Sequence, residues 1–245
     1  MTLNTYRLYR NKFRSNYGEL IICNDSKNYW RKDIFPYYKH GRKSKLKNSE
    51  LDWDSIFNTM TKIKEEVKTN LPYKNLTVNR TEADDIISVI CKNVRDEKIL
   101  IVSSDKDFQQ LQRYDNVEQY SPLKKEFLVC DDPETFLVDH IIKGDTSDGI
   151  PNILSDDDVF TIKEKRQKPC GKKKINEIKE DLSEWSTTDK WKRNQTLIDL
   201  NNIPSEYQSA IMVEYESHKP ADRSGMLNYF ITNRLKNLMS NIEEF

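Results

Sequence analysis

Apolar residues recur at helical spacing in several stretches of the first 143 residues, and each stretch predicts a helix. These stretches cover residues 3–17, 53–70, 82–94 and 133–142. The first ends at Gly18, and Ser49-Glu50-Leu51-Asp52 before the second resembles a capping box. At the third, Thr81 is expected to be the N-cap, with acidic residues in the first turn behind it.

Short apolar runs lie between the predicted helices and indicate strands. They cover residues 19–23, 76–78, 98–102, 116–120 and 126–130, and a short helix is expected from Phe108. The alternation of strand and helix favours an α/β fold with a mainly parallel central sheet flanked by helices.

The amino-acid composition and the hydrophobic pattern change at Gly144. Residues 144–174 combine glycine, proline and aspartate with a lysine run, and only helical patterns follow. We therefore expect two domains, an α/β domain over residues 1–143 and an all-helical C-terminal domain over residues 144–245.

Composition narrows the class of protein. The chain has 245 residues, a 36% hydrophobic content that supports an ordinary core, and 40 basic against 40 acidic side chains. Its four cysteines form no CxxC pair, so free thiols in a reducing compartment are expected. No stretch is apolar enough for a signal peptide or a membrane span, which predicts a soluble cytoplasmic protein without a membrane partner.

Basic side chains are concentrated in one segment although the net charge is zero. Residues 27–47 hold eight basic residues against one acid, interleaved with aromatic residues such as Tyr29 and Tyr37. Such a segment is typical of nucleic-acid binding, whereas core packing is the alternative role for its tyrosines.

Acidic residues gather where strands end and helices begin. They are Asp25, Glu82, Asp84, Asp85, Asp105, Asp107, Asp145 and Asp148. Any one cluster alone is more often a helix start, since the helix dipole favours acids in the first turn. The carboxyl ends of parallel strands share one sheet edge, however, so these clusters are expected to converge there.

Converging carboxylates must take up protons or bind cations, because like charges cannot all stay ionised at close range. Oxygen ligands with no His or Cys nearby in sequence suit Mg²⁺ or Mn²⁺ and argue against zinc. Two such ions about 3.5–4 Å apart would activate water and stabilise the leaving oxygen in phosphodiester hydrolysis. His40, His140 and His218 lie far apart in sequence and are interpreted as surface or structural residues.

Four motifs, in order and spacing, resemble those of the structure-specific 5′ nucleases, the family of flap endonucleases and phage 5′→3′ exonucleases. The motifs are Tyr29-Trp30-Arg31-Lys32-Asp33 with Pro36 to Arg42, Glu82-Ala83-Asp84-Asp85, Ser103 to Phe108, and Lys143 to Pro151. The likeness extends to Phe245 and so covers nearly the whole chain. It implies a 5′-nuclease or PIN-like fold for residues 1–143.

The resemblance assigns roles to individual positions. Asp25, Glu82, Asp84, Asp85 and Asp105 match ligands of a first metal ion, and Asp107, Asp145 and Asp148 match carboxylates around a second. Arg31 and Lys39 match catalytic residues that contact the scissile phosphate. The residues expected to bind nucleic acid are Arg31, Lys32, Lys39, Arg42 and Lys43. Lys172, Lys173 and Lys174 are added to them because they lie at a helix start that could hold a phosphate. A solvated loop is the alternative for this lysine run.

The implied function is a 5′→3′ exonuclease and flap endonuclease with ribonuclease H activity. It would use two Mg²⁺ ions, with Mn²⁺ as a substitute, to remove RNA primers and adjacent DNA during phage DNA replication in the host cytoplasm. Implied partners are DNA with a 5′ flap or single-stranded 5′ end, RNA–DNA hybrid, and a single-strand binding protein or sliding clamp; the chain would act as a monomer. The alternatives are a catalytically impaired DNA-binding relic and a toxin-type RNase.

Two departures from the family pattern alter these expectations. Family members begin with a strand that carries a metal-ligating Asp, whereas Met1 already lies in the helix expected after that strand. We therefore expect a segment upstream of Met1, which translation of the upstream DNA would reveal. The second departure follows Pro151, where Asp156-Asp157-Asp158 and scattered lysines replace the glycine-rich hairpins of a helix-hairpin-helix.

Overall fold

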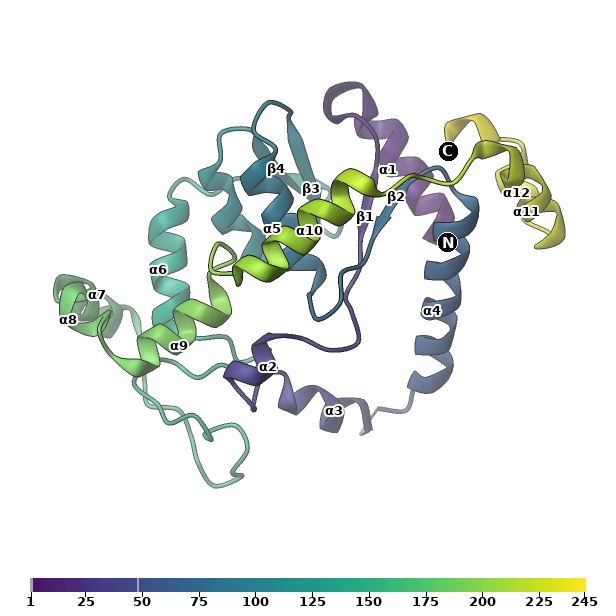
Figure 1. Ribbon diagram of the computed structural model, residues 1–245. Coiled ribbons are helices and arrows are strands. Elements are labelled where there is room, and N and C mark those ends of the chain that lie inside the picture. The colour runs from purple at the N-terminus through teal and green to yellow at the C-terminus, as the bar shows by residue number, and fades with distance from the viewer. Residues whose placement is uncertain (1, 48) are drawn as a thin grey trace.

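The computed structural model describes residues 2–47 and 49–245, with the side chains of residues 43–45 and 47 left aside. Its N-terminal part contains, in chain order, α1 (Thr2–Tyr17), β1 (Ile21–Cys23), α2 (Arg31–Ile34), α3 (His40–Lys47), α4 (Trp53–Asn70), β2 (Lys74–Leu76), α5 (Ala83–Asn93), β3 (Ile99–Val102), the 3₁₀ helix η1 (Lys106–Arg113), β4 (Val117–Ser121), β5 (Glu126–Leu128) and α6 (Pro133–Lys143). Figure 1 shows these elements around two small sheets.

The strands form one parallel pair and one mixed sheet. β1 pairs with β2 in parallel, and Ile21 lies opposite Lys74. β3 pairs in parallel with β4, which pairs antiparallel with β5. Over the described residues, the two sheets share no hydrogen-bonded strand pair. The predicted α/β fold with mainly parallel pairing is confirmed, and the strand expected before Met1 stays a prediction.

Three local predictions were wrong in detail. β2 covers residues 74–76 instead of 76–78, because Val78 accepts hydrogen bonds from the Thr81 backbone and hydroxyl and so begins a turn. For the same reason Thr81 does not cap α5; Glu82 does, in a capping box with Asp85. At α4 the cap is the Asp52 side chain, which accepts from Ser55 N at 3.1 Å, and Ser49 plays no part in it.

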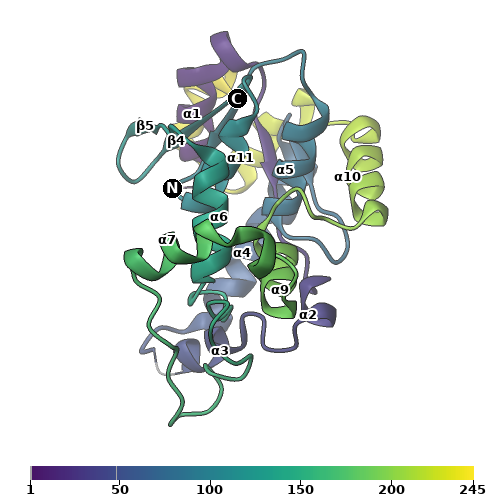
Figure 2. The ribbon, with the colours of Figure 1, turned by 90° about the vertical axis from the view of Figure 1, so that its left-hand side faces the viewer.

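The C-terminal part is helical, as predicted. It holds α7 (Lys172–Glu180), α8 (Leu182–Trp185), α9 (Asp189–Ile198), α10 (Ser205–Ser217), the 3₁₀ helix η2 (Arg223–Gly225), α11 (Met226–Thr232), α12 (Lys236–Met239) and the 3₁₀ helix η3 (Ile242–Glu244). The segment before α7 is an extended loop that projects from the rest of the chain (Figures 1 and 2). None of the described helices is both long and apolar enough to cross a membrane.

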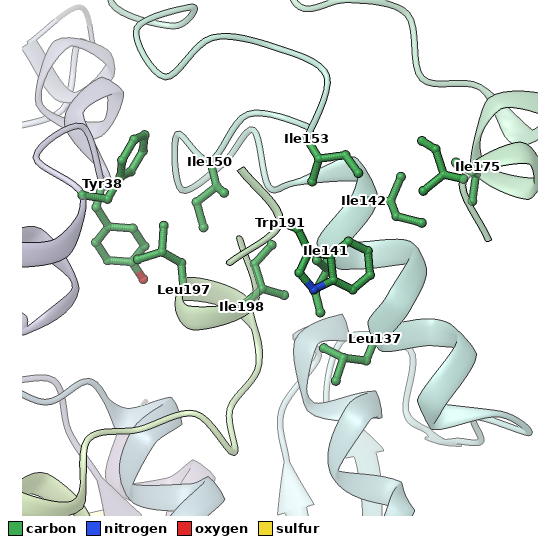
Figure 3. Close-up of a cluster of buried hydrophobic side chains, with 12 residues drawn as sticks. Tyr38, Leu137, Ile141, Ile142, Ile150, Ile153, Ile175, Trp191, Leu197 and Ile198 are labelled. Carbon is green, nitrogen blue, oxygen red and sulfur yellow. The ribbon is translucent and has the colours of Figure 1, made fainter. Parts of the chain in front are cut away.

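Hydrophobic cores join the two parts of the chain. The largest cluster packs α6 against α9, with Tyr38 and Ile150 beside them (Figure 3). Another places Phe245, which is fully buried, against Val67 and Leu71 of the α4 end. All four buried clusters combine residues from before and after position 144. The division into two domains between residues 143 and 144 therefore stays a prediction. In the structure, both parts contribute side chains to the same hydrophobic cores.

Gly144 ends α6 in a conformation that only glycine adopts without strain. Its φ is +67° and its ψ is −172°, and a Cβ at this position would overlap the backbone of Ile150 and Pro151. We expect Gly144→Ala to lower the free energy of unfolding by about 1–3 kcal/mol, because it adds backbone strain and a clash. Urea denaturation measures this. Gly225→Ala is the matched control, since Gly225 has φ −78° and open space around it; equal effects of the two substitutions would contradict the prediction.

Candidate metal centre

The end of β1 and the start of α5 form the first half of the site. Asp25 follows β1, and its Oδ1 accepts a hydrogen bond from Ala83 N at 2.8 Å. This bond fixes the Asp25 carboxylate against the first turn of α5, which carries Glu82, Asp84 and Asp85. The predicted convergence of these acidic segments is therefore present in the structure.

Glu82 is buried, with 2% of its surface exposed, and its carboxylate has three donors. The Arg31 Nη1 atom donates at 3.0 Å and the Tyr38 hydroxyl at 2.8 Å, while the Lys39 ammonium is paired with the other oxygen. Because the Tyr38 ring packs into the cluster of Figure 3, Glu82 is anchored to the hydrophobic core. This set of donors compensates the cost of burying a charge.

Asp85 and Arg31 lie in the protein interior next to Glu82. Asp85 is fully buried and accepts from Trp30 Nε1 at 3.1 Å and from its own capping-box partner, the Glu82 N–H, at 2.9 Å. Arg31 Nη2 lies 2.7 Å from Asp85 Oδ1, and Arg31 Nε donates to Leu197 O at 3.0 Å. These contacts occupy the Asp85 carboxylate inside the protein.

The position of Arg31 corrects its expected role in phosphate contact. The Arg31 side chain is 2% exposed, and its guanidinium forms ion pairs with Glu82 and Asp85 inside the protein. A nucleic-acid strand has no access to it here. The sequence could not reveal this, because the bidentate chemistry that suits a phosphate suits a buried carboxylate equally well.

Three carboxylates act electrostatically on a fourth, Asp84, in this half of the site. The pKa of Asp84 is raised to about 7, first by burial and then by the charge of Glu82, with Asp105 and Asp25 adding to the rise and Lys39 opposing it. The charges of the predicted residues Asp25, Glu82 and Asp105 thus act on Asp84. Among the described residues, however, the set whose ligand atoms lie within 4.8 Å of one another is Asp107, His140 and Asp145.

Asp105 connects the first half of the site to the second. It follows β3, and its Oδ1 caps η1 by accepting from Asp107 N at 3.0 Å. Asp107 lies beside His140 and is influenced by the charges of Asp105 and Asp145. Burial is the main reason that the pKa of Asp107 is raised, to about 6.

Asp145 lies on the loop that follows α6. Its Oδ1 accepts from Ser147 N at 2.7 Å and from Ser147 Oγ at 2.6 Å. Burial would raise its pKa, but the interaction with His140 and the hydrogen bonds from Ser147 outweigh burial and lower it. Asp145 is therefore an ionised carboxylate held in one orientation.

His140 is the residue of this site that the sequence interpretation missed. It lies in the last turn of α6 with 6% of its surface exposed, so the prediction of a structural histidine gave no hint of its neighbours. The ring lies between Asp107 and Asp145, with Nδ1 3.6 Å and Nε2 3.4 Å from their carboxylate oxygens. Its place four residues before the Gly144-Asp145 turn was the available signal, since that turn brings the loop back to the helix end.

Asp148 joins the acidic centre to the basic segment. Its side chain accepts from the Tyr38 hydroxyl at 3.1 Å and from Arg42 Nη2 at 2.5 Å, and its carbonyl accepts from Lys39 N at 2.7 Å. Lys39 Nζ lies 3.6 Å from the Asp148 carboxylate. Lys39 and Arg42 are thus held at the edge of the carboxylate cluster.

The remaining predicted nucleic-acid contacts are divided. Lys32 is exposed, with its ammonium 5.1 Å from the centre of the Tyr29 ring. The Lys43 side chain lies outside the described residues. Lys172, Lys173 and Lys174 begin α7, which packs on α6, and Lys174 pairs with Glu177 at 3.1 Å. The α7 lysines thus belong to a separate element from the basic segment of α2 and α3 (Figure 2).

Unsatisfied polar atoms in the second half of the site fit a cation. Asp107 Oδ1 and both ring nitrogens of His140 are buried without a hydrogen-bond partner among the described residues. One ligand atom from each of Asp107, His140 and Asp145 lies within 4.8 Å of the others. Buried polar atoms without partners are costly, so a bound cation would stabilise this arrangement.

Comparisons with known proteins cover the whole chain. Residues 3–138 match the family model of the 5′–3′ exonuclease N-terminal resolvase-like domain, and residues 131–245 match that of the T4 RNase H C-terminal region. The ribonuclease H of Enterobacteria phage T4 is 33% identical over an alignment of 260 positions, gaps included, that covers 100% of this chain and 85% of that protein. A 5′–3′ exonuclease of Buchnera aphidicola subsp. Schizaphis graminum is 30% identical over 62% of this chain and 53% of its own length.

Solved structures share the fold at lower sequence identity. A bacteriophage T5 protein co-crystallised with metal ions superimposes with a TM-score of 0.60 at 19% identity, covering 98% of this chain and 91% of that one. A T5 flap endonuclease in a pseudo-enzyme-product complex with DNA and metal ions gives a TM-score of 0.60 at 17% identity, covering 98% and 89%. The chain therefore belongs to the 5′–3′ exonuclease family and is a phosphodiester hydrolase.

Proposed function

We propose that the chain is a metal-dependent 5′→3′ exonuclease and flap endonuclease that also removes RNA from RNA–DNA hybrids. The observation that carries this proposal is the convergence of two acidic groups that share Asp105. One contains Asp25, Glu82 and Asp84, and the other contains Asp107 and Asp145. Such an arrangement suits hydrolysis of a phosphodiester with divalent cations.

We propose that the acidic residues hold two divalent cations, Mg²⁺ with Mn²⁺ as a substitute. Asp25, Glu82, Asp84 and Asp105 would hold the first ion, and Asp107, Asp145 and Asp148 would surround the second. When bound, the ions would lower the pKa of a water and stabilise the charge that develops on the phosphate oxygens. Asp85 and Arg31 are proposed as positioning residues, because their contacts fix Glu82 from inside the protein.

Basic and aromatic side chains around α2 and α3 would hold the single-stranded 5′ arm. Lys39 and Arg42 both pair with the Asp148 carboxylate beside the metal centre. From there they would contact a phosphate bound next to the carboxylates. Exposed Lys32 stands over Tyr29, where a cation and a ring can engage a nucleotide together. The lysines at the start of α7 would contact the backbone of the duplex.

We infer the biological role of the chain from the proteins to which it is similar. The T4 relative is a ribonuclease H, and a T5 neighbour was crystallised with DNA and metal ions. We propose removal of RNA primers and adjacent DNA during phage replication in the host cytoplasm, by a monomer. A single-strand binding protein or sliding clamp is the proposed partner.

A cleavage assay tests the proposal. The full chain is incubated with a 5′-flap DNA duplex and with an RNA-primed duplex, with Mg²⁺ or with EDTA. The expected result is Mg²⁺-dependent release of short 5′ products from both substrates. Binding of the flap without cleavage would instead establish a DNA-binding relic, and cleavage confined to RNA would establish an RNase.

The raised pKa values predict how pH acts on the metal-free protein. The folded-state pKa values of Asp84 (about 7) and Asp107 (about 6) lie above an unfolded value of about 3.9. The folded protein therefore binds these protons more tightly, and its free energy of unfolding falls as pH rises from about 4 to about 7. Divalent metal binds the ionised carboxylates, so the gain in Tm on adding Mg²⁺ should be larger near pH 8 than near pH 5.

Thermal unfolding with EDTA and with Mg²⁺ at the two pH values measures this effect. Asp84→Asn, which cannot ionise, should flatten the pH dependence of the EDTA sample. A gain in Tm that is equal at both pH values would contradict the prediction.

A further inference from the structure

His140 occupies an unusual environment for a buried histidine. It has 6% of its surface exposed, it contacts Phe136 edge-on at 5.9 Å between ring centroids, and neither ring nitrogen has a hydrogen-bond partner within the described part of the chain. Leaving a buried polar atom unsatisfied costs about 1–3 kcal/mol. Both nitrogens lie at ion-pair distance from carboxylate oxygens but make no hydrogen bond within the described residues, which leaves them available to a cation between the three side chains.

The surroundings of the ring suit a cation. Nδ1 faces Asp107 Oδ1 at 3.6 Å, and that oxygen too lacks a hydrogen-bond partner among residues 2–47 and 49–245. Nε2 faces Asp145 Oδ2 at 3.4 Å, while the other oxygen of Asp145 is held by Ser147. The three side chains thus present ligand atoms within 4.8 Å of one another.

We propose that His140 is a nitrogen ligand of the second metal ion, together with Asp107 and Asp145. One ring nitrogen would bind the ion, and the other would carry the imidazole proton. The inference builds on the proposed two-cation site, but it assigns a ligand and a metal preference that an all-carboxylate site does not have.

The two metal positions then differ in chemistry. The first would be surrounded by oxygen atoms only, from Asp25, Glu82, Asp84 and Asp105, which suits Mg²⁺. The second combines oxygen with imidazole nitrogen, which favours Mn²⁺, Co²⁺ or Zn²⁺ over Mg²⁺ because imidazole binds transition metals more strongly. The two positions would therefore differ in metal preference, although both could take Mg²⁺.

Pulsed EPR of the metal-free full chain loaded with Mn²⁺ tests the assignment, because a directly bound ¹⁴N nucleus modulates the electron spin echo. The expected result is a ¹⁴N coupling in the wild-type protein that is lost in His140→Gln. The same variant should lower the affinity for Mn²⁺ by about 10–100-fold relative to Mg²⁺, as measured by calorimetry.

A matched control uses the other histidines, His40 and His218. The double variant His40→Gln with His218→Gln keeps His140 as the only histidine, so it should retain the coupling; it also decides the question if His140→Gln fails to fold. Absence of the coupling in Mn²⁺-loaded wild type, its persistence in His140→Gln, or failure to bind Mn²⁺ would overturn the proposal. Flap cleavage with Mg²⁺ is scored separately, so coupling without cleavage would reject the nuclease function alone, and cleavage without coupling would reject the nitrogen ligand alone.

Discussion

Replacing Asp105 with asparagine is expected to lower Mg²⁺-dependent cleavage of a 5′ flap by more than about 100-fold. Asp105 is shared by the two acidic groups, since its charge acts on both Asp84 and Asp107. Loss of that charge would weaken both cation positions at once. The fold should survive, because the amide oxygen of the asparagine can still accept the hydrogen bond from Asp107 N that begins η1.

Single-turnover cleavage rates, together with a Tm measured in EDTA, separate chemistry from folding in this experiment. Asp115→Asn is the matched control, because Asp115 is an exposed loop aspartate. The control should cleave like the wild type. An Asp105→Asn enzyme that retains wild-type rates would remove Asp105 from the metal centre.

The second large effect concerns stability. Arg31→Met removes the cation between two buried carboxylates and is expected to lower the free energy of unfolding by about 3–5 kcal/mol, the usual cost of leaving a buried charge unpaired. Asp85 would lose more than Glu82, because it would keep only the Trp30 and backbone N–H donors. Glu82 would still have Tyr38 and Lys39.

Urea denaturation in EDTA measures the difference. Lys32→Met is the control, because the neighbouring Lys32 is exposed, and substitutions of this kind usually change stability by less than about 0.5 kcal/mol. Arg31→Lys should lie between the two, since it keeps the charge but loses the forked geometry. A destabilisation by Arg31→Met as small as that of the control would show that the buried pair is not needed.

Local signals in the sequence predicted most of the elements. The helix Trp53–Asn70 and the helix Pro133–Lys143 follow from apolar periodicity, which acts within a few turns. Strand β2 was misplaced because the turn at Val78 depends on a side-chain bond from Thr81 that apolar periodicity does not report. Helices and strands could thus be predicted where interactions between residues close in sequence determine them.

The site was predictable to the extent that strand ends gather acidic residues. Asp25 follows β1 and Asp105 follows β3, and the expectation that acidic residues gather after strands was correct for both. The single shared sheet edge was not, because β1 and β3 belong to separate sheets. The buried state of Arg31 was not predictable, because it depends on Leu197, which lies 166 positions away in the chain. His140 was missed although Asp145 is near it in the sequence, because its other carboxylate neighbour, Asp107, comes from the separate element η1.

The burial of Phe245 bears on how the chain reaches its fold. Its ring completes a cluster with Val67 and Leu71, and Glu244 beside it pairs with Arg7 of α1 at 2.6 Å. On a ribosome the apolar α4 end emerges long before residues 226–245, and at about 5–20 residues per second the interval is roughly 8–30 s. Until residues 226–245 emerge, this apolar surface lacks its C-terminal cover, so we expect the chain to be most prone to aggregation in that interval.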